Sequence, residues 1–174
     1  MIAPTEGGLT MPDSIELEPV TARMRTFFIH ANANDSLLEV MQVMQLARIR
    51  HLPVLEQGVL VGVVSHRDVL QLLAHPGAGR TEARSSEELR RLPVSGVMHG
   101  VVYSIGPDAT LAEAAQEMLR YGVGFLPVVV PTDAGSRMVG LITESDLLTA
   151  AYVPRFAAAV VERSPAEASR IEHS

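Results

Sequence analysis

Two short motifs, Ser65-x-x-Asp68 and Thr143-x-x-Asp146, place a hydroxyl and a carboxylate three residues apart. Each motif follows a β-rich run and opens a helical pattern, where free N–H groups and the positive end of the helix dipole suit a phosphate. The hydroxyl can donate to a phosphate oxygen, and the Asp can accept from both hydroxyls of a ribose, as acidic residues do in dinucleotide-binding folds. The same spacing also forms a near capping box, which alone is far more often a helix cap than a nucleotide site.

Basic side chains gather around the first motif, and the set comprises Arg48, Arg50, His51, His66 and Arg67. A local basic cluster in an acidic chain indicates a focused anion site. Arg67 stands beside Asp68 and suits a phosphate through forked, charge-assisted bonds, although a solvated surface Arg explains it equally well. The second motif has Ser145 in that place. We therefore expect the first motif to be the better site for an anionic phosphate.

The chain contains an internal repeat, which explains why the motif occurs twice. Val20–Val54 matches Val94–Val128 at an offset of 74 residues, and Gly62–Leu70 matches Gly140–Leu148 at an offset of 78. A duplication of this length predicts two similar units, and small ligands commonly bind in the clefts at such joints.

Each repeat has the hydrophobic pattern of a β-α-β-β-α unit. In the first repeat the predicted strands are Thr26–His30, Leu52–Glu56 and Val59–Ser65, and the predicted helices begin near Leu37 and His66. In the second repeat the predicted strands are Val101–Ser104, Phe125–Val130 and Met138–Thr143, and the predicted helices are Thr110–Tyr121 and one from Glu144.

Local signals mark the ends of these elements. Ser36 with Glu39 predicts a capping box, and Thr110 predicts a second N-cap. Gln57-Gly58 predicts a hairpin turn. The second hairpin is four residues longer, and we assign the extra residues to its loop, because loops tolerate insertions cheaply.

The predicted organisation has five parts. They are a flexible leader at 1–19, a first unit at 20–74, a linker at 75–93, a second unit at 94–153 and a C-terminal helix or tail at 154–174. The linker is polar, with one short helix predicted at Ser86–Arg91. A further helix is predicted at Tyr152–Val161.

The composition limits the classes of function. Hydrophobic residues make up 47% of the 174 residues, so a substantial core is available. Cysteine and lysine are both absent, which excludes disulfides, thiolate metal sites and a P-loop lysine. The net charge of −6 without a basic block argues against nucleic-acid binding. No apolar run approaches the roughly 18–20 residues of a membrane helix, and the N-terminus lacks a signal-peptide pattern, so we expect a cytoplasmic protein.

No catalytic or metal-binding pattern stands out. The six His residues show no HxxxH or HExxH spacing, and no G-x-S-x-G is present. Glu144, beside the second motif, could hold a metal bound to phosphates, but a Glu favoured by the helix dipole is the simpler account. We therefore expect a protein that is not an enzyme and has no metal and no obligatory cofactor.

These features together resemble a tandem pair of CBS domains, the arrangement called a Bateman module, over about residues 15–153. The resemblance rests on the segments ending in Met24 and Met98, on the Leu-Pro-Val of both repeats, and on GVVSHRDVL with its counterpart GLITESDLL. It implies an α/β (α+β) fold in which two β-α-β-β-α units pack sheet to sheet around a pseudo-two-fold axis. It also implies that the clefts bind an adenosine-containing ligand such as AMP, ADP, ATP, S-adenosylmethionine or NAD.

The predicted ligand-binding residues come from both repeats. They are Phe28, Arg50, His51, Leu52, Pro53, Ser65, Arg67 and Asp68 in the first repeat, and Val102, Phe125, Leu126, Pro127, Thr143, Ser145 and Asp146 in the second. In the CBS family the stretch before Leu-Pro lies near the ligand. Phe28, Val102 and Phe125 could form an apolar wall for adenine, although core packing explains these side chains equally well or better.

The function implied by the resemblance is a regulatory sensor, which binds its ligand between the units and transmits a conformational change to an unknown partner protein. The alternative is a ligand-free scaffold that mediates protein–protein interaction or dimerisation. We also expect a homodimer, because two helices present apolar faces that mark an interface. The residues of these faces are Leu111, Ala114, Ala115 and Met118 in one helix, and Leu147 and Leu148 in the other.

Overall fold

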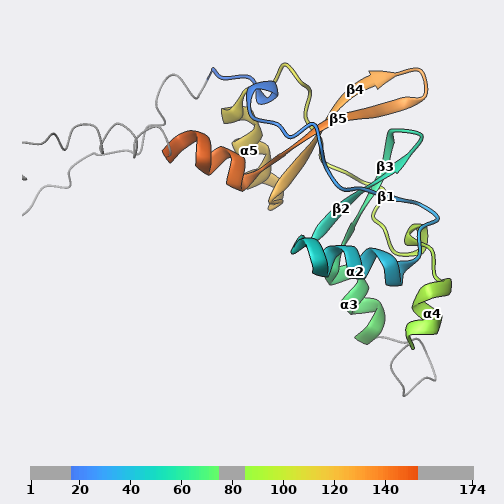
Figure 1. Cartoon of the computed structure of the whole chain (residues 1–174). Coiled ribbons are helices and arrows are strands. Elements are labelled where there is room, and N and C mark those ends of the chain that lie inside the picture. Colours follow the sequence, from blue (N-terminus) through green and yellow to red (C-terminus); the bar gives the residue numbers. More distant parts are fainter. Residues whose placement is uncertain (1–16, 75–84, 153–174) are drawn as a thin grey trace, which may run out of the picture. The chain divides into compact units, whose positions relative to one another are not determined.

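The computed structural model describes residues 17–74 and 85–152 of the chain (Figure 1). Its elements are η1 (Val20–Ala22), β1 (Ala31–Asn32), α2 (Leu37–Ala47), β2 (His51–Glu56), β3 (Val59–Ser65), α3 (His66–Ala74), α4 (Ser86–Arg91), η2 (Val94–Gly96), α5 (Leu111–Tyr121), β4 (Phe125–Thr132) and β5 (Gly135–Thr143). Residues 144–152 are also helical. The predictions for the leader up to residue 16, for the C-terminal tail and for the helix beyond residue 152 lie outside the described residues.

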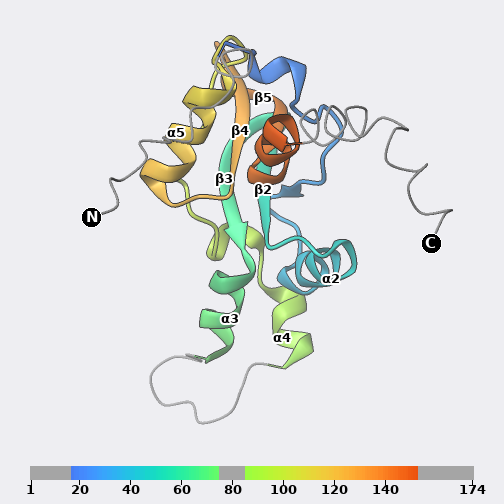
Figure 2. The same ribbon diagram turned by 90° about the vertical axis from the view of Figure 1, so that its left-hand side faces the viewer.

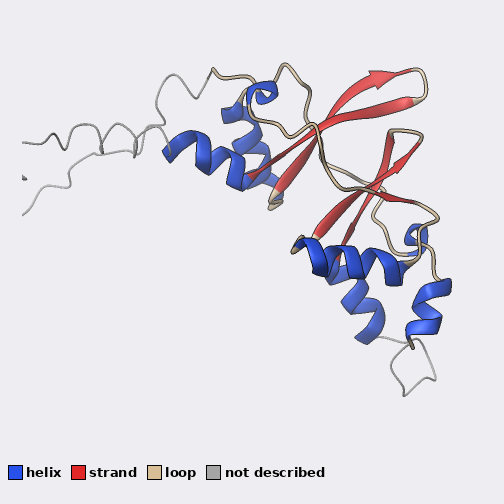
Figure 3. Cartoon of the chain, viewed as in Figure 1, coloured by secondary structure: helices blue, strands red, loops and turns tan. Residues whose placement is uncertain are grey.

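Five strands form one sheet in the order β1-β2-β3-β5-β4. β1 runs parallel to β2, and β2 and β3 are antiparallel. β3 joins β5 through Val59 and Arg137, which are equivalent positions of the two repeats. Figure 3 shows the hairpins β2–β3 and β4–β5 as red arrows. The predicted mixed α/β fold is confirmed.

The first strand of each repeat is shorter and later than predicted. Residues 26–30 and 101–104 form no strand. Pairing begins instead at Ala31, which pairs with Val54, and at Ile105, which bridges Val128. Both pairs are parallel and lie 74 residues apart, so the two repeats share one register.

The predictions at Thr26–His30 and Val101–Ser104 are therefore wrong, and exposure gives the reason. Phe27 is 93% exposed and Val101 is 81% exposed. A β-rich composition reports how well side chains suit a pleated, half-buried surface, and it does not supply a neighbouring strand.

The two hairpins have equal turns and unequal strands. Gln57 and Gly58 have φ values of 51° and 83°, as a tight two-residue turn requires. The second turn also spans two residues, 133–134, but β4 and β5 have 8 and 9 residues against 6 and 7 in β2 and β3. The assignment of the extra residues to a loop is wrong. Two lengthen each strand, where backbone groups find partners that a longer loop would leave to water.

The lead-in segments of the repeats, residues 18–25 and 92–99, are exchanged. Pro19 bridges Thr110 at the start of α5, whereas Pro93 bridges Ser36 at the start of α2. The two bridges are equivalent under the 74-residue offset. Each lead-in segment therefore begins beside the helix of the other repeat.

The chain divides into two compact lobes that reflect this exchange. Among the described residues, the α2 lobe comprises 25–74, 85–107 and 127–141, and the α5 lobe comprises 17–24, 108–126 and 142–152. In the α2 lobe, α2, α3 and α4 gather at one end of β2 and β3 (Figure 2). Their contacts close a core of Ala31, Ala33, Leu37, Val40, Met44, Leu52, Val54, Val64, Val69 and Val94.

The α5 lobe corrects the basis of the homodimer expectation. Leu111, Ala114 and Met118 are buried within the chain, so they cannot form an exposed face. Hydrophobic side chains that remain exposed on the same helices are Leu119, at 84%, and Leu148, at 58%. An interface on this lobe would have to use these residues.

Helix caps follow the predictions closely. Thr110 and Glu113 form a reciprocal capping box at α5. Ser36 caps α2 by accepting from the Glu39 N–H. The predicted linker helix is confirmed as α4, and Ser85 begins it with a capping box of its own.

Candidate ligand-binding site

The first motif closes a capping box where β3 passes directly into α3. Asp68 Oδ2 accepts from the Ser65 N–H at 2.9 Å and from the Ser65 hydroxyl at 2.6 Å. In return, the Asp68 N–H donates to Ser65 Oγ at 3.2 Å. These bonds satisfy donors that the first turn of a helix leaves unpaired. The cap uses one carboxylate oxygen of Asp68 and leaves the other for a different partner.

That second oxygen meets a histidine that the sequence reasoning missed. His99 Nε2 lies 2.9 Å from Asp68 Oδ1, with the Asp68 side chain 10% exposed and the His99 side chain 68% exposed. Backbone bonds hold His99 in place, because its N–H donates to Val63 O and the Val63 N–H donates to His99 O. One signal was available: His99 lies 74 residues after Arg25, so both lead-in segments end on a basic residue.

Close packing at Gly62 lets this lead-in segment approach β3. A Cβ at Gly62 would lie 2.8 Å from Met98 Sδ and 3.0 Å from His99 O. Real side chains do not tolerate the first distance, and the second involves backbone. Gly62 is thus required for the position of His99 beside Asp68.

The surroundings of Asp68 favour its charged form. Burial alone would raise the pKa of Asp68, but hydrogen bonds from Ser65 and His99 outweigh burial, so the pKa lies below its usual value. Hydrogen bonds to a carboxylate stabilise the ionised form. Asp68 is therefore an anion with both oxygens directed by neighbours.

The predicted basic cluster lies together around this motif. Burial lowers the pKa of His51, the positive charges of Arg50 and Arg67 lower it further, and Asp68 opposes them. The His66 N–H donates to Arg50 O at 2.8 Å, which ties the residue before β2 to the first residue of α3. The chain thus brings two guanidinium groups and a histidine close to Asp68.

Other predicted residues contribute backbone or apolar surface. Leu52 and Leu126 are fully buried, and Pro53 and Pro127 are buried as well. Their side chains belong to the core, so a ligand would meet only their backbone. The half-buried side chains are Phe28, Val102 and Phe125.

The second motif repeats the capping box. Asp146 Oδ2 accepts from the Thr143 N–H at 2.9 Å and from its hydroxyl at 2.5 Å, and the Asp146 N–H donates to Thr143 Oγ1. The Glu144 N–H donates to Gly124 O at 3.1 Å, as His66 does to Arg50 in the first repeat. The Glu144 carboxylate lies over Gly124, because a Cβ added there would be 3.4 Å from Oε2.

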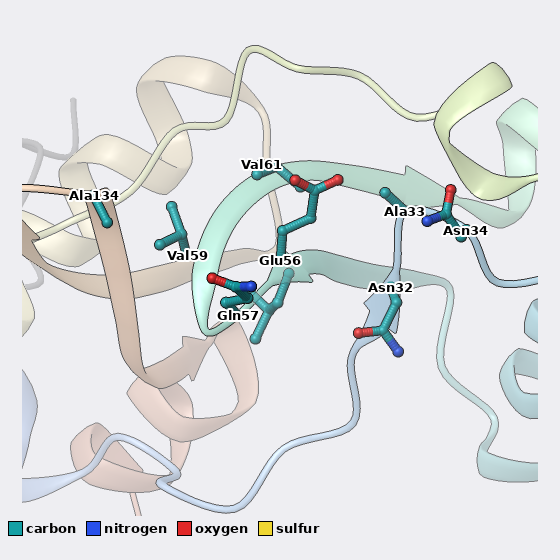
Figure 4. Close-up of a pocket in the computed structure, with 9 residues that line it drawn as sticks. Asn32, Ala33, Asn34, Glu56, Gln57, Val59, Val61 and Ala134 are labelled. Carbon is teal, nitrogen blue, oxygen red and sulfur yellow. The ribbon is translucent and has the colours of Figure 1, made fainter.

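A separate cavity of about 610 Å³ opens elsewhere in the α2 lobe (Figure 4). Its lining comprises Asn32, Ala33, Asn34, Leu55, Glu56, Gln57, Val59, Val61 and Ala134. No predicted site residue lines it. Within residues 17–74 and 85–152, no group of three or more His, Asp or Glu side chains is arranged to hold a metal ion. In the same residues, no helix is long and apolar enough to cross a membrane.

Comparison with known proteins establishes the family. The CBS domain family matches residues 18–75 and 94–152, and the chain belongs to this family. The CBS domain-containing protein YhcV of Bacillus subtilis is 29% identical over 131 residues, covering 75% of this chain and 84% of YhcV. An uncharacterised 33.4 kDa protein of Thermofilum pendens is 31% identical, but this chain spans only 41% of its length.

A solved structure gives a more specific comparison. The CBS domain pair of protein MJ0100, in complex with 5′-methylthioadenosine and S-adenosyl-L-methionine, is 26% identical with a TM-score of 0.58. The match covers 76% of this chain and 98% of that one. The chain is thus a pair of CBS domains with the fold of a regulatory module.

Proposed function

We propose that this CBS pair is a regulatory module that binds an adenosine-containing ligand through its Ser65-Asp68 and Thr143-Asp146 motifs. The single observation that carries the proposal is the basic cluster around Asp68. Arg50, His51 and Arg67 surround an ionised carboxylate at a helix start. A ribose can donate to the carboxylate while its phosphate meets the guanidinium groups. The ligand complexes of the MJ0100 CBS pair support the adenosine class.

The bond from His99 does not block this role for Asp68. A carboxylate oxygen has two lone pairs, so Oδ1 can accept from His99 and from a ribose hydroxyl together. AMP, ADP and ATP fit the first motif best, because the cationic groups there suit phosphate. S-adenosylmethionine and NAD are the other adenosine ligands to compare.

The proposed output is a change of conformation that a partner protein reads. A ligand produces such a change only to the extent that it binds one arrangement more tightly than the other. The proposal includes a homodimer, a cytoplasmic location and a binding function without catalysis. The partner protein is identified only as one whose activity follows ligand occupancy.

One observation favours the alternative, a scaffold without ligand. Both carboxylates are fully explained as parts of helix caps, since each closes a capping box with its Ser or Thr. A scaffold would keep these residues for folding alone. The two hypotheses differ in whether nucleotides bind.

Thermal unfolding with AMP, ADP, ATP, S-adenosylmethionine and NAD decides between them. At a concentration about 100 times Kd, a ligand adds about 2.7 kcal/mol to the free energy of unfolding. For a chain of this size that corresponds to a rise of roughly 5–10 °C in Tm. Mass spectrometry of small molecules that co-purify identifies a tightly held ligand. If no ligand raises Tm and none co-purifies, the scaffold is the correct function.

A further inference from the structure

The two motifs have the same backbone frame, which makes their side chains comparable position by position. The residue before β2 accepts a backbone bond from the first residue of α3, and the residue before β4 accepts the same bond from residue 144. Both motifs also close the same capping box. Side chains at these equivalent positions therefore start from equivalent places around each carboxylate.

The charges at these positions are reversed between the repeats. The first repeat has Arg50, His51, His66 and Arg67, and the second has Gly124, Phe125, Glu144 and Ser145. With His neutral, two positive charges are lost and one negative charge is gained, so the second set is three charge units more negative. Arg50 and Arg67 act on His51 as close positive charges. In the second repeat, the Glu144 carboxylate lies over Gly124 instead.

This reversal has a direct consequence for the ligand. A phosphate placed beside Glu144 would meet a like charge and no guanidinium group, which disfavours binding. A cationic group would instead meet a carboxylate. Phe125, which follows Gly124 and is half-buried, adds an aromatic ring of the kind that attracts cations. A Glu at a helix start is also favoured by the dipole, but that account does not explain the loss of all four basic residues.

We propose that the second motif binds an adenosine derivative with a cationic substituent, such as a sulfonium or an ammonium group, while the first motif binds an adenosine phosphate. This inference rests on the proposed function, since it requires that both motifs bind adenosine. Glu144 is the residue that sets the charge preference of the second motif.

The test is titration calorimetry of the full chain with two probes, AMP and S-adenosylmethionine. S-adenosylmethionine should bind AMP-saturated protein as tightly as free protein, because the two ligands use different motifs. Glu144→Gln removes the charge and keeps the shape of the side chain. It should weaken S-adenosylmethionine about fivefold, the upper range for an exposed ion pair, and leave AMP unchanged.

Two further variants make the result specific. Glu117→Gln removes the same charge from α5, away from the motif, and should change neither affinity. Arg67→Gln should weaken AMP and spare S-adenosylmethionine. The inference is overturned if AMP displaces S-adenosylmethionine, or if Glu144→Gln leaves the affinity for S-adenosylmethionine unchanged. If neither probe binds the wild-type chain, the proposed function itself fails and this inference fails with it.

Discussion

His99 Nε2 lies 2.9 Å from Asp68 Oδ1, although the two residues are 31 positions apart in the chain. His99 ends the lead-in segment of the second repeat, and Asp68 begins the last helix of the first. The contact joins the two repeats at the carboxylate that we assign to ribose binding. Any movement of this lead-in segment therefore changes the surroundings of Asp68.

Asp68→Ala should weaken AMP binding roughly 10- to 100-fold, because a hydrogen bond to a carboxylate contributes about 1.5–3 kcal/mol. Asp146→Ala should affect AMP less, since the basic cluster accompanies Asp68. Each variant also loses part of a helix cap, at a cost of about 0.5–2 kcal/mol, so circular dichroism must show that both still fold. If both variants bind AMP like the wild type in calorimetry, the two motifs serve only as caps.

Stability should fall as the pH drops through the titration of His51. The folded state lowers the pKa of His51, so the unfolded state binds the proton more readily. The stability is therefore fully present above the unfolded pKa of about 6.5 and declines as pH falls through the lower folded pKa. Urea unfolding of His51→Asn between about pH 7.5 and 5 should show a flatter dependence than the wild type. An identical slope in both proteins would show that His51 is not the responsible group.

The helix and hairpin signals were predictable because they are local. Thr110 and Glu113 lie three residues apart, and Gln57-Gly58 are adjacent, so short-range rules describe them. The position of β1 was not predictable from composition, because it depends on where β2 offers a partner to Ala31. The exchange of lead-in segments likewise depends on contacts between repeats.

The candidate site shows the same division. The motifs and the basic cluster were found from residue types, since the repeat places them at fixed offsets. His99 was missed because its bond to Asp68 requires the backbone pairing of His99 with Val63. The burial of Leu111 and Met118 was missed because a helical apolar face does not reveal whether the chain itself covers that face.

The protein should be a dimer, with Leu119 and Leu148 in or near its interface. Large exposed apolar side chains on neighbouring elements mark association surfaces. Light scattering at micromolar concentration should give twice the 18.7 kDa chain mass. Leu119→Glu and Leu148→Glu together should lower the measured mass toward one chain, whereas the exposed Leu46→Glu on α2 serves as the control. A monomer mass for the wild type would contradict the prediction.

Gly62→Ala should destabilise the protein by about 1–3 kcal/mol, because the new methyl group overpacks the contact with Met98 and His99. Gly106→Ala is the matched control, since nothing lies within 4 Å of its added Cβ. Urea unfolding should give a lower midpoint for Gly62→Ala and a nearly unchanged one for Gly106→Ala. Equal midpoints for the two variants would mean that the lead-in segment adjusts without cost.

Thr110→Ala should cost more stability than Ser36→Ala, although the two residues cap equivalent helices. Thr110 accepts from the Glu113 N–H at 3.2 Å, and its own N–H donates to the Glu113 carboxylate at 2.8 Å. Ser36 Oγ accepts from the Glu39 N–H at only 3.4 Å. Loss of a good N-cap costs about 0.5–2 kcal/mol, and we expect Thr110→Ala in the upper half of that range and Ser36→Ala in the lower half. Urea unfolding of both variants measures the difference, and a larger loss for Ser36→Ala would show that cap geometry does not control stability here.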